Sequence, residues 1–251
     1  MSYWKKIMVV TVSIVATANL MAAGGVIQVG RSKPQKVYSL TALPSGVLKV
    51  IYKPGQPESS LKKGSYRVIS YSLSSNTFKK AQDLLTAKKY QSAEKIASAQ
   101  FNTLKWLGHG VVPGIILGKS LFAQKKFAES EVIFTSCRKL NGNNKEFEST
   151  ILLEHAKTLQ AQNKTEKLVM VIPGLLKAGG SAAAFAFNTQ GATARKEKDN
   201  EGALLSYMKT FTFFSTKDEE VQIYRAEAKK NIIELFVEMN DNRAKTFQNE
   251  K

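Results

Sequence analysis

Gly118-Lys119-Ser120 is the first of three short stretches whose residue types could do chemistry. It matches the end of the phosphate-binding motif G-x-x-x-x-G-K-[ST]. That motif needs a glycine five positions before Gly118, where this chain has Pro113. It also needs a strand before the loop, whereas apolar residues around Gly118 recur at helical spacing. We therefore expect Gly118 to lie inside a helix and expect no nucleotide site there.

Glu154-His155 is the second stretch and could supply an acid and a base. Adjacent residues on a helix point about 100° apart, so these two side chains would not work together. We expect His155 to be a buried core residue at a contact between helices. His109, which lies between two glycines, is expected in a loop.

The third stretch surrounds Cys137, the single cysteine of the chain. It falls where an expected helix carries small core residues, so we predict a buried, unreactive thiol. One cysteine and two histidines are too few for a zinc site of the His/Cys type. Neither G-x-S-x-G nor H-E-x-x-H occurs. We expect no enzyme activity, no metal and no cofactor, with an unrecognised catalytic site as the alternative.

The charge balance of the chain is strongly positive. The 251 residues include 37 Lys+Arg against 20 Asp+Glu, a formal net charge of +17, and 43% are hydrophobic. That proportion supports a globular core. The charge favours contact with a polyanion such as nucleic acid, anionic lipid or an acidic envelope polymer. The alternative is that lysines only solvate helix faces.

The first 23 residues have the pattern of a secretory signal peptide. Two lysines precede a mostly apolar run at 7–15, and small residues follow. We favour cleavage after Ala22 or Ala23, although Ala16-Thr17-Ala18 also fits the A-x-A rule. An uncleaved membrane anchor is the alternative. The run is shorter than the ~20 residues that a membrane-spanning helix needs, which favours the signal peptide. We expect export to the periplasm or cell envelope, or secretion, and no transmembrane span in the mature chain.

Residues 24–73 are predicted to form a small β-rich module. Four short runs rich in β-branched residues or alternating in polarity lie between proline and glycine turns, at 26–29, 36–40, 46–52 and 66–71. Four such strands indicate a small curled antiparallel sheet, for which an SH3-like barrel is one form. The module has one acid, Glu58, and eight basic residues: Arg31, Lys33, Lys36, Lys49, Lys53, Lys62, Lys63 and Arg67.

From residue 74 onward, apolar residues recur at spacings of three and four, which predicts helices. Self-comparison of this part gives a repeat of about 37 residues. In each unit a small residue is followed by leucine at +3, an aromatic at +9 and a small residue at +12, and the second unit adds an aromatic at +16. The positions are Ala81, Leu84, Tyr90 and Ala93, then Gly118, Leu121, Phe127, Ser130 and Phe134.

This pattern resembles the tetratricopeptide repeat, over roughly residues 74–214. The third unit keeps Ala156, Leu159 and Ile172 but has Thr165 at the aromatic position and Leu168 at the second small position. The fourth unit keeps Gly191, Ala203 and Tyr207 but has Ala194 at +3 and Asn200 at +9. The resemblance implies a mainly α fold, a right-handed superhelical array of helix pairs after the β module. Repeats with a closing helix would cover 74–239, and 240–251 would be a frayed tail. An irregular helical bundle is the alternative.

The resemblance also implies where a ligand would bind, since the first helices of stacked pairs line a concave groove that often holds peptides. In this sequence the positions that correspond to the family's groove are Phe78, Gln82, Ile115, Lys119, Phe122, Lys157, Asn188, Arg195 and Lys196. Lys119, Lys157, Arg195 and Lys196 would form a basic rail suited to an acidic or C-terminal peptide. Ordinary solvated lysines are the alternative.

Two functions follow as expectations. The first is an exported, non-enzymatic scaffold that binds proteins or peptides, acidic ones among them, through its repeats. The layout of signal, β module and repeats resembles envelope repeat proteins of some Gram-negative bacteria, a resemblance that carries no activity. The second is a basic module that binds a polyanion, chiefly through the β region. Salt separates them, because polyanion binding weakens steeply as salt rises.

Overall fold

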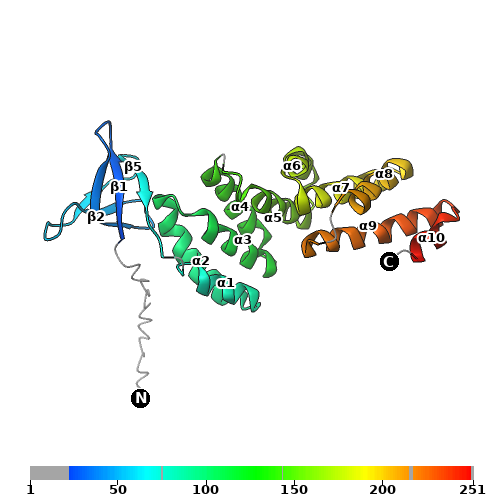
Figure 1. Ribbon diagram of the computed structural model, residues 1–251, viewed down its shortest axis with the longest axis horizontal. Helices are drawn as coiled ribbons and strands as arrows, with labels where there is room; N and C mark the ends of the chain where they lie inside the picture. The colour runs from blue at the N-terminus through cyan, green and yellow to red at the C-terminus, as the bar shows by residue number, and fades with distance from the viewer. Residues whose placement is uncertain (1–22, 75, 143, 215–216, 250–251) are drawn as a thin grey trace, which may run out of the picture. The chain divides into compact units, whose positions relative to one another are not determined.

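The computed structural model describes residues 23–74, 76–142, 144–214 and 217–249. Within these ranges the chain is mainly helical, with a small antiparallel sheet on its N-terminal side (Figure 1). It divides into two compact units between Ser72 and Leu73, here called the β unit and the helical unit. The expected signal segment lies outside the described residues except for Ala23, which begins the first strand.

The β unit contains one five-stranded sheet with the order β4-β3-β2-β1-β5, in which every neighbouring pair is antiparallel. Its strands are β1 (Ala23–Val29), β2 (Gln35–Ala42), β3 (Leu48–Ile51), β4 (Ser59–Leu61) and β5 (Tyr66–Tyr71). The expectation of a small antiparallel sheet is therefore confirmed. The expectation of four strands missed β4, because its three residues carry neither a β-branched nor an aromatic side chain.

The core of the β unit comes from side chains on one face of the sheet. Ile27, Leu40, Leu48 and Val50 are at most 1% exposed. Along β3 alternation turns the residues between them away from the core, because successive side chains point to opposite faces, whereas on β2 both Ser39 and Leu40 are buried. The Oη of Tyr66 donates a hydrogen bond of 2.6 Å to the carbonyl oxygen of Gly46, which joins β5 to the turn before β3.

The helical unit contains ten α-helices and one short 3-10 helix among its described residues. Their bounds are α1 (Lys79–Thr86), α2 (Tyr90–Leu104), η1 (Lys105–Leu107), α3 (Val111–Ala123), α4 (Phe127–Asn141), α5 (Glu148–Ala161), α6 (Thr165–Ala178), α7 (Gly180–Lys196), α8 (Asn200–Phe213), α9 (Glu219–Glu238) and α10 (Arg243–Asn249). Each helix packs against the next one in sequence. Each odd-numbered helix from α1 to α7 also contacts the next odd-numbered helix.

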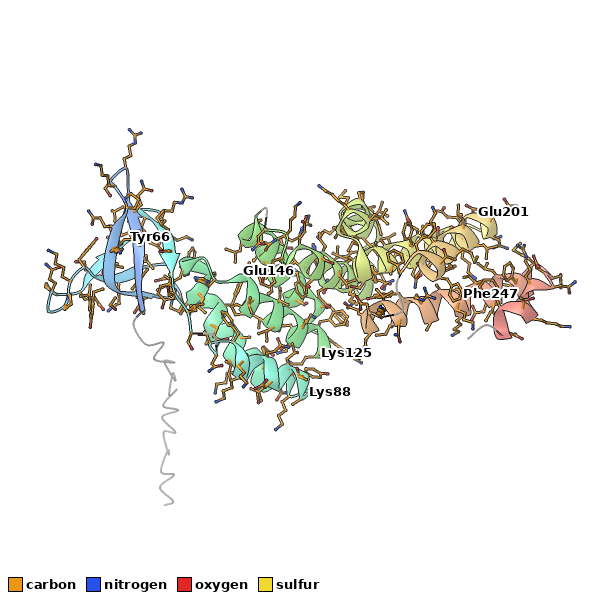
Figure 2. All side chains as sticks on the ribbon, in the orientation of Figure 1. Tyr66, Lys88, Lys125, Glu146, Glu201 and Phe247 are labelled. Carbon is orange, nitrogen blue, oxygen red and sulfur yellow. The ribbon has the colours of Figure 1, made fainter. Side chains whose placement is uncertain are left out.

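The turns after the odd-numbered helices share one backbone form. Lys88, Lys125, Asn163, Lys198 and Asn240 follow α1, α3, α5, α7 and α9, and they are the only described non-glycine residues with positive φ. After α1, the amide of Lys88 bonds to Leu85 O and the next amide bonds to Leu84 O, and the other four turns repeat both bonds. Such a turn satisfies the last carbonyls of a helix. Figure 2 labels Lys88 and Lys125 at two of these turns.

The fifth of these turns corrects the expectation of a frayed tail at 240–251. Asn240 has the same backbone as the other four turn residues, and Arg243–Asn249 then form α10. Phe247 of α10 (labelled in Figure 2) packs its ring 5.5 Å from that of Phe211 and 5.6 Å from that of Phe236. Residues 243–249 are helical because these aromatic contacts bury an apolar face, so α9 and α10 form a fifth pair rather than a closing helix alone.

The residues expected to pack between helices are buried or half-buried: Ala81, Leu84, Tyr90, Ala93, Gly118, Leu121, Phe127, Ser130 and Phe134. Two of the small positions face an aromatic ring sixteen residues later. A Cβ added to Gly118 would lie 2.5 Å from Phe134 Cζ, and one added to Gly191 would lie 2.8 Å from Tyr207 Cε1. Glycine therefore occupies the small position in these two units, where the +16 residue is aromatic. Where the small residue is alanine, the +16 residue is smaller, as in Ala81 with Ala97.

Two glutamates on even-numbered helices each bind the turn of the next helix pair. This arrangement is called a polar clamp here. Glu94 of α2 accepts hydrogen bonds from Gln124 Nε2 at 2.6 Å and from Lys126 Nζ at 2.9 Å. Glu131 of α4 accepts the equivalent bonds from Gln162 Nε2, at 3.0 Å, and from Lys164 Nζ. The clamp joins one helix pair to the next and was not anticipated from the sequence.

Candidate ligand-binding site

The stretch resembling a phosphate-binding loop lies inside α3. Gly118 and Ser120 are buried, and Ser120 Oγ donates to the carbonyl oxygen of Ile116 at 2.8 Å. A phosphate needs several free amide groups at a helix N-terminus, and mid-helix amides are occupied by the helix itself. The expectation that Gly118 lies inside a helix is confirmed.

Cys137 is fully buried in the core shared by α1 to α5. Burial raises the pKa of its thiol to about 12. The thiolate, which is the reactive form, is therefore scarce at neutral pH. This environment matches the predicted unreactive thiol.

Glu154 and His155 face different partners. The Glu154 carboxylate lies 3.4 Å from Lys119 Nζ and 3.2 Å from Lys157 Nζ. His155 is 7% exposed, and its Nδ1 has no hydrogen-bond partner among the described residues. Burial, followed by the nearby charges of Arg138 and Lys167, lowers the pKa of His155 to about 4, although Glu131 acts in the opposite direction. The prediction of a buried core histidine is confirmed.

The lowered pKa of His155 predicts a loss of stability in mild acid. Unfolding returns the imidazole to its ordinary pKa of 6.5, so the unfolded chain binds more protons between pH 6.5 and 4, and the free energy of unfolding falls as pH drops through this window. The full effect of this histidine is about 3 kcal/mol. In His155→Leu, urea unfolding measured at both ends of the window should show a pH dependence smaller by that amount. Equal dependence in both proteins would contradict a buried neutral imidazole.

The residues expected to line the groove lie on or beside odd-numbered helices. Phe78 precedes α1, and Ile115 lies on α3; both are half-buried against the core that contains Cys137. The ring of Phe122 lies 5.3 Å from that of Phe127, so it serves partly as a contact between α3 and α4. Gln82 is exposed. The apolar residues expected in the groove, Phe78, Ile115 and Phe122, are thus largely taken up by packing between helices.

The expected basic rail is occupied by internal ion pairs. Lys119 pairs with Glu154, and Lys157 pairs with Glu154 and, at 2.8 Å, with Glu220 of α9. Burial acts to lower the pKa of Lys157, but Glu154 and Glu220 outweigh it and raise that pKa, so this ammonium stays charged and paired.

Arg195 is held in the same way by Glu234, at 2.8 Å, and by Glu238. Lys196 is exposed and has no ion pair with a described residue. Three of the four expected rail cations are therefore paired within the chain. For Lys157 and Arg195 the reason is that α9 brings Glu220, Glu234 and Glu238 against α5 and α7.

A cavity of about 200 Å³ lies between α5, α7 and α9. Its lining residues are Lys157, Gln160, Phe185, Asn188, Thr189, Ala192, Tyr224 and Glu227. Asn188 is 5% exposed, and its Nδ2 donates to Tyr224 O at 2.9 Å and to Glu227 Oε2 at 3.1 Å. Its Oδ1 accepts no hydrogen bond from any described residue. A buried acceptor without a donor costs free energy, so this amide oxygen is suited to accept from a ligand N–H.

Tyr224 gives the cavity an aromatic wall. Lys157 Nζ lies 5.9 Å from the centre of the Tyr224 ring, and burial raises the pKa of the Tyr224 hydroxyl to about 12. That hydroxyl therefore remains protonated at neutral pH. The cavity combines two aromatic rings, Phe185 and Tyr224, with the Asn188 amide oxygen, the paired Lys157 ammonium and the Glu227 carboxylate. This lining can orient a polar segment.

The sequence expectation named Lys157 and Asn188 at this cavity but missed the lining residues Tyr224 and Glu227 and the Lys157 partner Glu220. All three lie on α9, which was interpreted only as a closing helix. A usable signal was present, because polar residues recur on α9 at spacings of three and four. They are Glu220, Tyr224, Glu227, Asn231, Glu234 and Glu238, the side of α9 that meets α5 and α7.

Neither a known family model, nor a curated protein, nor a solved structure matches this chain. No helix in the described ranges has the length and apolar character needed to span a bilayer. Among the same residues, no three His, Cys, Asp or Glu side chains are grouped so that they could hold a metal ion.

Proposed function

We propose that this protein is an exported, non-enzymatic scaffold whose helical unit is a tetratricopeptide-like array that holds an extended peptide segment. Export rests on the positive and apolar start of the sequence. The array rests on consecutive odd-numbered helices in contact and on five turns of one backbone form. Stacked helix pairs of this kind form a right-handed superhelix that presents its first helices on a concave face.

The observation that carries the peptide-binding role is the cavity at Asn188. Its amide is held by two hydrogen bonds from Nδ2, which fix the direction of the buried Oδ1. A peptide main-chain N–H is the donor that this acceptor lacks, and the Tyr224 ring offers a surface for an apolar side chain. Preorganised groups of this kind lower the entropy cost of binding.

An acidic peptide is not part of the proposal for this cavity. Lys119, Lys157 and Arg195 are already paired with carboxylates of the same chain. A ligand carboxylate would have to compete with these partners, and displacing Glu154, whose side chain is 9% exposed, would leave a buried charge without its cations at a cost. Recognition through the peptide main chain and one apolar side chain is the mode that the contacts favour.

Selection of random peptides displayed against the purified full chain tests this role. We expect selected peptides to bind Asn188→Ala about tenfold more weakly, because one hydrogen bond to the peptide main chain is lost. Ala192→Phe, which fills the cavity and leaves the Asn188 hydrogen bonds in place, should weaken binding at least as much. Isothermal titration measures both effects, and the affinity should change little with salt, since few charges are involved.

Ala128→Phe is the matched control for the filling variant, because Ala128 is exposed on α4 and does not line the cavity. It should leave peptide affinity unchanged. Melting followed by circular dichroism checks that all three variants are folded. If selected peptides bind Ala192→Phe as tightly as the original chain, the cavity is not the binding site.

A second candidate function, polyanion binding by the β unit, rests on a separate observation. The described residues of this unit carry eight basic side chains and one carboxylate. That carboxylate, Glu58, pairs with Lys49 at 2.6 Å. Net charge so concentrated in about fifty residues attracts polyanions at long range.

A further inference from the structure

Two turns gather basic side chains at one end of the β unit. The turn between β1 and β2 carries Arg31 and Lys33, and the turn between β4 and β5 carries Lys62 and Lys63. The amide of Gly30 donates to Ser65 O at 3.0 Å and joins the two turns. Four cations from separate parts of the sequence therefore lie at the same end of the sheet.

Two more cations lie on the outward face beside these turns. In the sheet register, Lys36 of β2 lies opposite Val26 and Arg67 of β5 lies opposite Gln28. Val26 and Gln28 flank the core residue Ile27 on β1, so Lys36 and Arg67 point to the face away from the core. Both are exposed. The basic face is defined here as Arg31, Lys33, Lys36, Lys62, Lys63 and Arg67, and Glu58, the single described acid of this unit, is paired with Lys49 on β3.

A β-bulge presents Tyr38 on the same face. The pairing of β1 with β2 shifts between Ala23 and Gly25, so two residues of β2, Tyr38 and Ser39, oppose Gly24. Bulges commonly re-aim a side chain in this way. Tyr38 is 57% exposed, and Gly24 has no side chain to cover its ring.

The two tyrosines of β5 are less exposed than Tyr38 of β2. Tyr66 is half-buried and its hydroxyl is bonded to Gly46, while Tyr71 is 7% exposed. Tyr38 also lies two residues from Lys36 on one strand. An open aromatic ring thus adjoins a row of cations, the combination used to bind single-stranded nucleic acid, in which cations track the phosphates and bases stack on rings.

We propose that the basic face binds single-stranded nucleic acid, with phosphates on its six cations and one base stacked on Tyr38. This rests on the polyanion role proposed for the β unit and deepens it. A lipid surface fits less well, because the turn 30–34 has no large apolar side chain to insert among lipids. Duplex DNA fits less well because its bases are already stacked and the described part of the β unit has no helix for the major groove.

Fluorescence anisotropy of a labelled oligothymidylate of about 20 nucleotides, titrated with the full chain, tests the proposal. Tyr38→Ala should weaken binding about tenfold, and Tyr38→Phe should bind like the original chain because the stacking ring remains. Lys36→Glu with Arg67→Glu should weaken binding about 100-fold. The matched control, Lys53→Glu with Lys80→Glu, changes net charge equally but lies outside the basic face and should cost much less.

Duplex DNA of the same length and anionic phospholipid vesicles serve as competing polyanions. The proposal is supported if the single strand binds most tightly and only its binding depends on Tyr38. If all three bind equally and Tyr38→Ala changes nothing, the single-strand inference is overturned while the polyanion role stands. If none binds even at low salt, the polyanion role itself is wrong.

Discussion

Replacing Gly118 by alanine should lower the free energy of unfolding by about 1 kcal/mol, and by up to about 2 kcal/mol. The added Cβ would lie 2.5 Å from Phe134 Cζ and 2.8 Å from two further ring atoms. Both residues are buried, so neither the ring nor the helix can move into open space, and overpacking of this kind costs about 1–3 kcal/mol. This cost exceeds the gain of about 1 kcal/mol that alanine offers over glycine in a helix. Urea unfolding followed by circular dichroism measures the difference.

Gly174→Ala is the matched control. Gly174 also lies inside a helix, α6, but a Cβ there would meet the nearest atom, Leu152 Cδ1, at an ordinary 3.5 Å. This substitution should raise the free energy of unfolding by up to about 1 kcal/mol. The two glycine-to-alanine changes should therefore have opposite signs, and equal signs would contradict the packing argument.

The double variant Gly118→Ala with Phe134→Ile carries the same test further. It copies the third unit, where Ala156 and Ile172 occupy these two positions. Removing the ring relieves the clash, so the double variant should cost less than the sum of the two single changes by about 1 kcal/mol or more. Strictly additive costs would mean that the two positions do not contact each other.

Glu131→Ala should cost about 2–3 kcal/mol at neutral pH. The Glu131 side chain is 13% exposed and accepts hydrogen bonds from Gln162 Nε2, Lys164 Nζ and Lys167 Nζ. Its removal leaves these donors without their partner and opens the link between the second and third helix pairs. The equivalent change at Glu94, which is 24% exposed, should cost about 1 kcal/mol.

The cost of Glu131→Ala should also depend on pH. Burial acts to raise the pKa of Glu131, but the hydrogen bonds from Lys164, Lys167 and Gln162 outweigh it and lower that pKa from 4.5 to about 2. A carboxyl with a lowered folded pKa contributes stability above its unfolded pKa and loses it as pH falls toward the folded value. The difference between original chain and variant should therefore shrink between pH 4.5 and 2.

Glu146→Ala is the control for the clamp, because Glu146 is an exposed loop residue (labelled in Figure 2). It should change stability by less than about 0.5 kcal/mol. A Glu131→Ala cost no larger than that of Glu146→Ala would show that the clamp contributes nothing to the contact between helix pairs.

Local patterns in the sequence predicted most of the secondary structure because burial imposes a period on each element. Residues recurring at three and four marked the helices, and Ala81, Gly118 and Ala156 marked the close contacts within pairs. The elements that were missed are short. Ser59–Leu61 and Arg243–Asn249 have too few residues to show a period, and each is held in place by contacts with distant residues.

The charges of the candidate site could not be predicted in the same way. Lys157 pairs with Glu220, which lies 63 residues later, and Arg195 with Glu238, 43 residues later. A repeat frame places each residue on a face of its own helix but does not say which carboxylates a later helix brings there. The turns of positive φ were equally hidden, because lysine at Lys88, Lys125 and Lys198 is not a residue type that indicates this conformation.

Hydrogen exchange of the full chain, with and without a saturating selected peptide, tests the scaffold proposal most directly. Binding along the odd-numbered helices should slow amide exchange in α5, α7 and α9, whose side chains line the cavity at Asn188. The account predicts that this protection is lost in Ala192→Phe and kept in Ala128→Phe. Protection confined to α4, α6 and α8, or to the β unit, would contradict peptide binding on the inner face of the array.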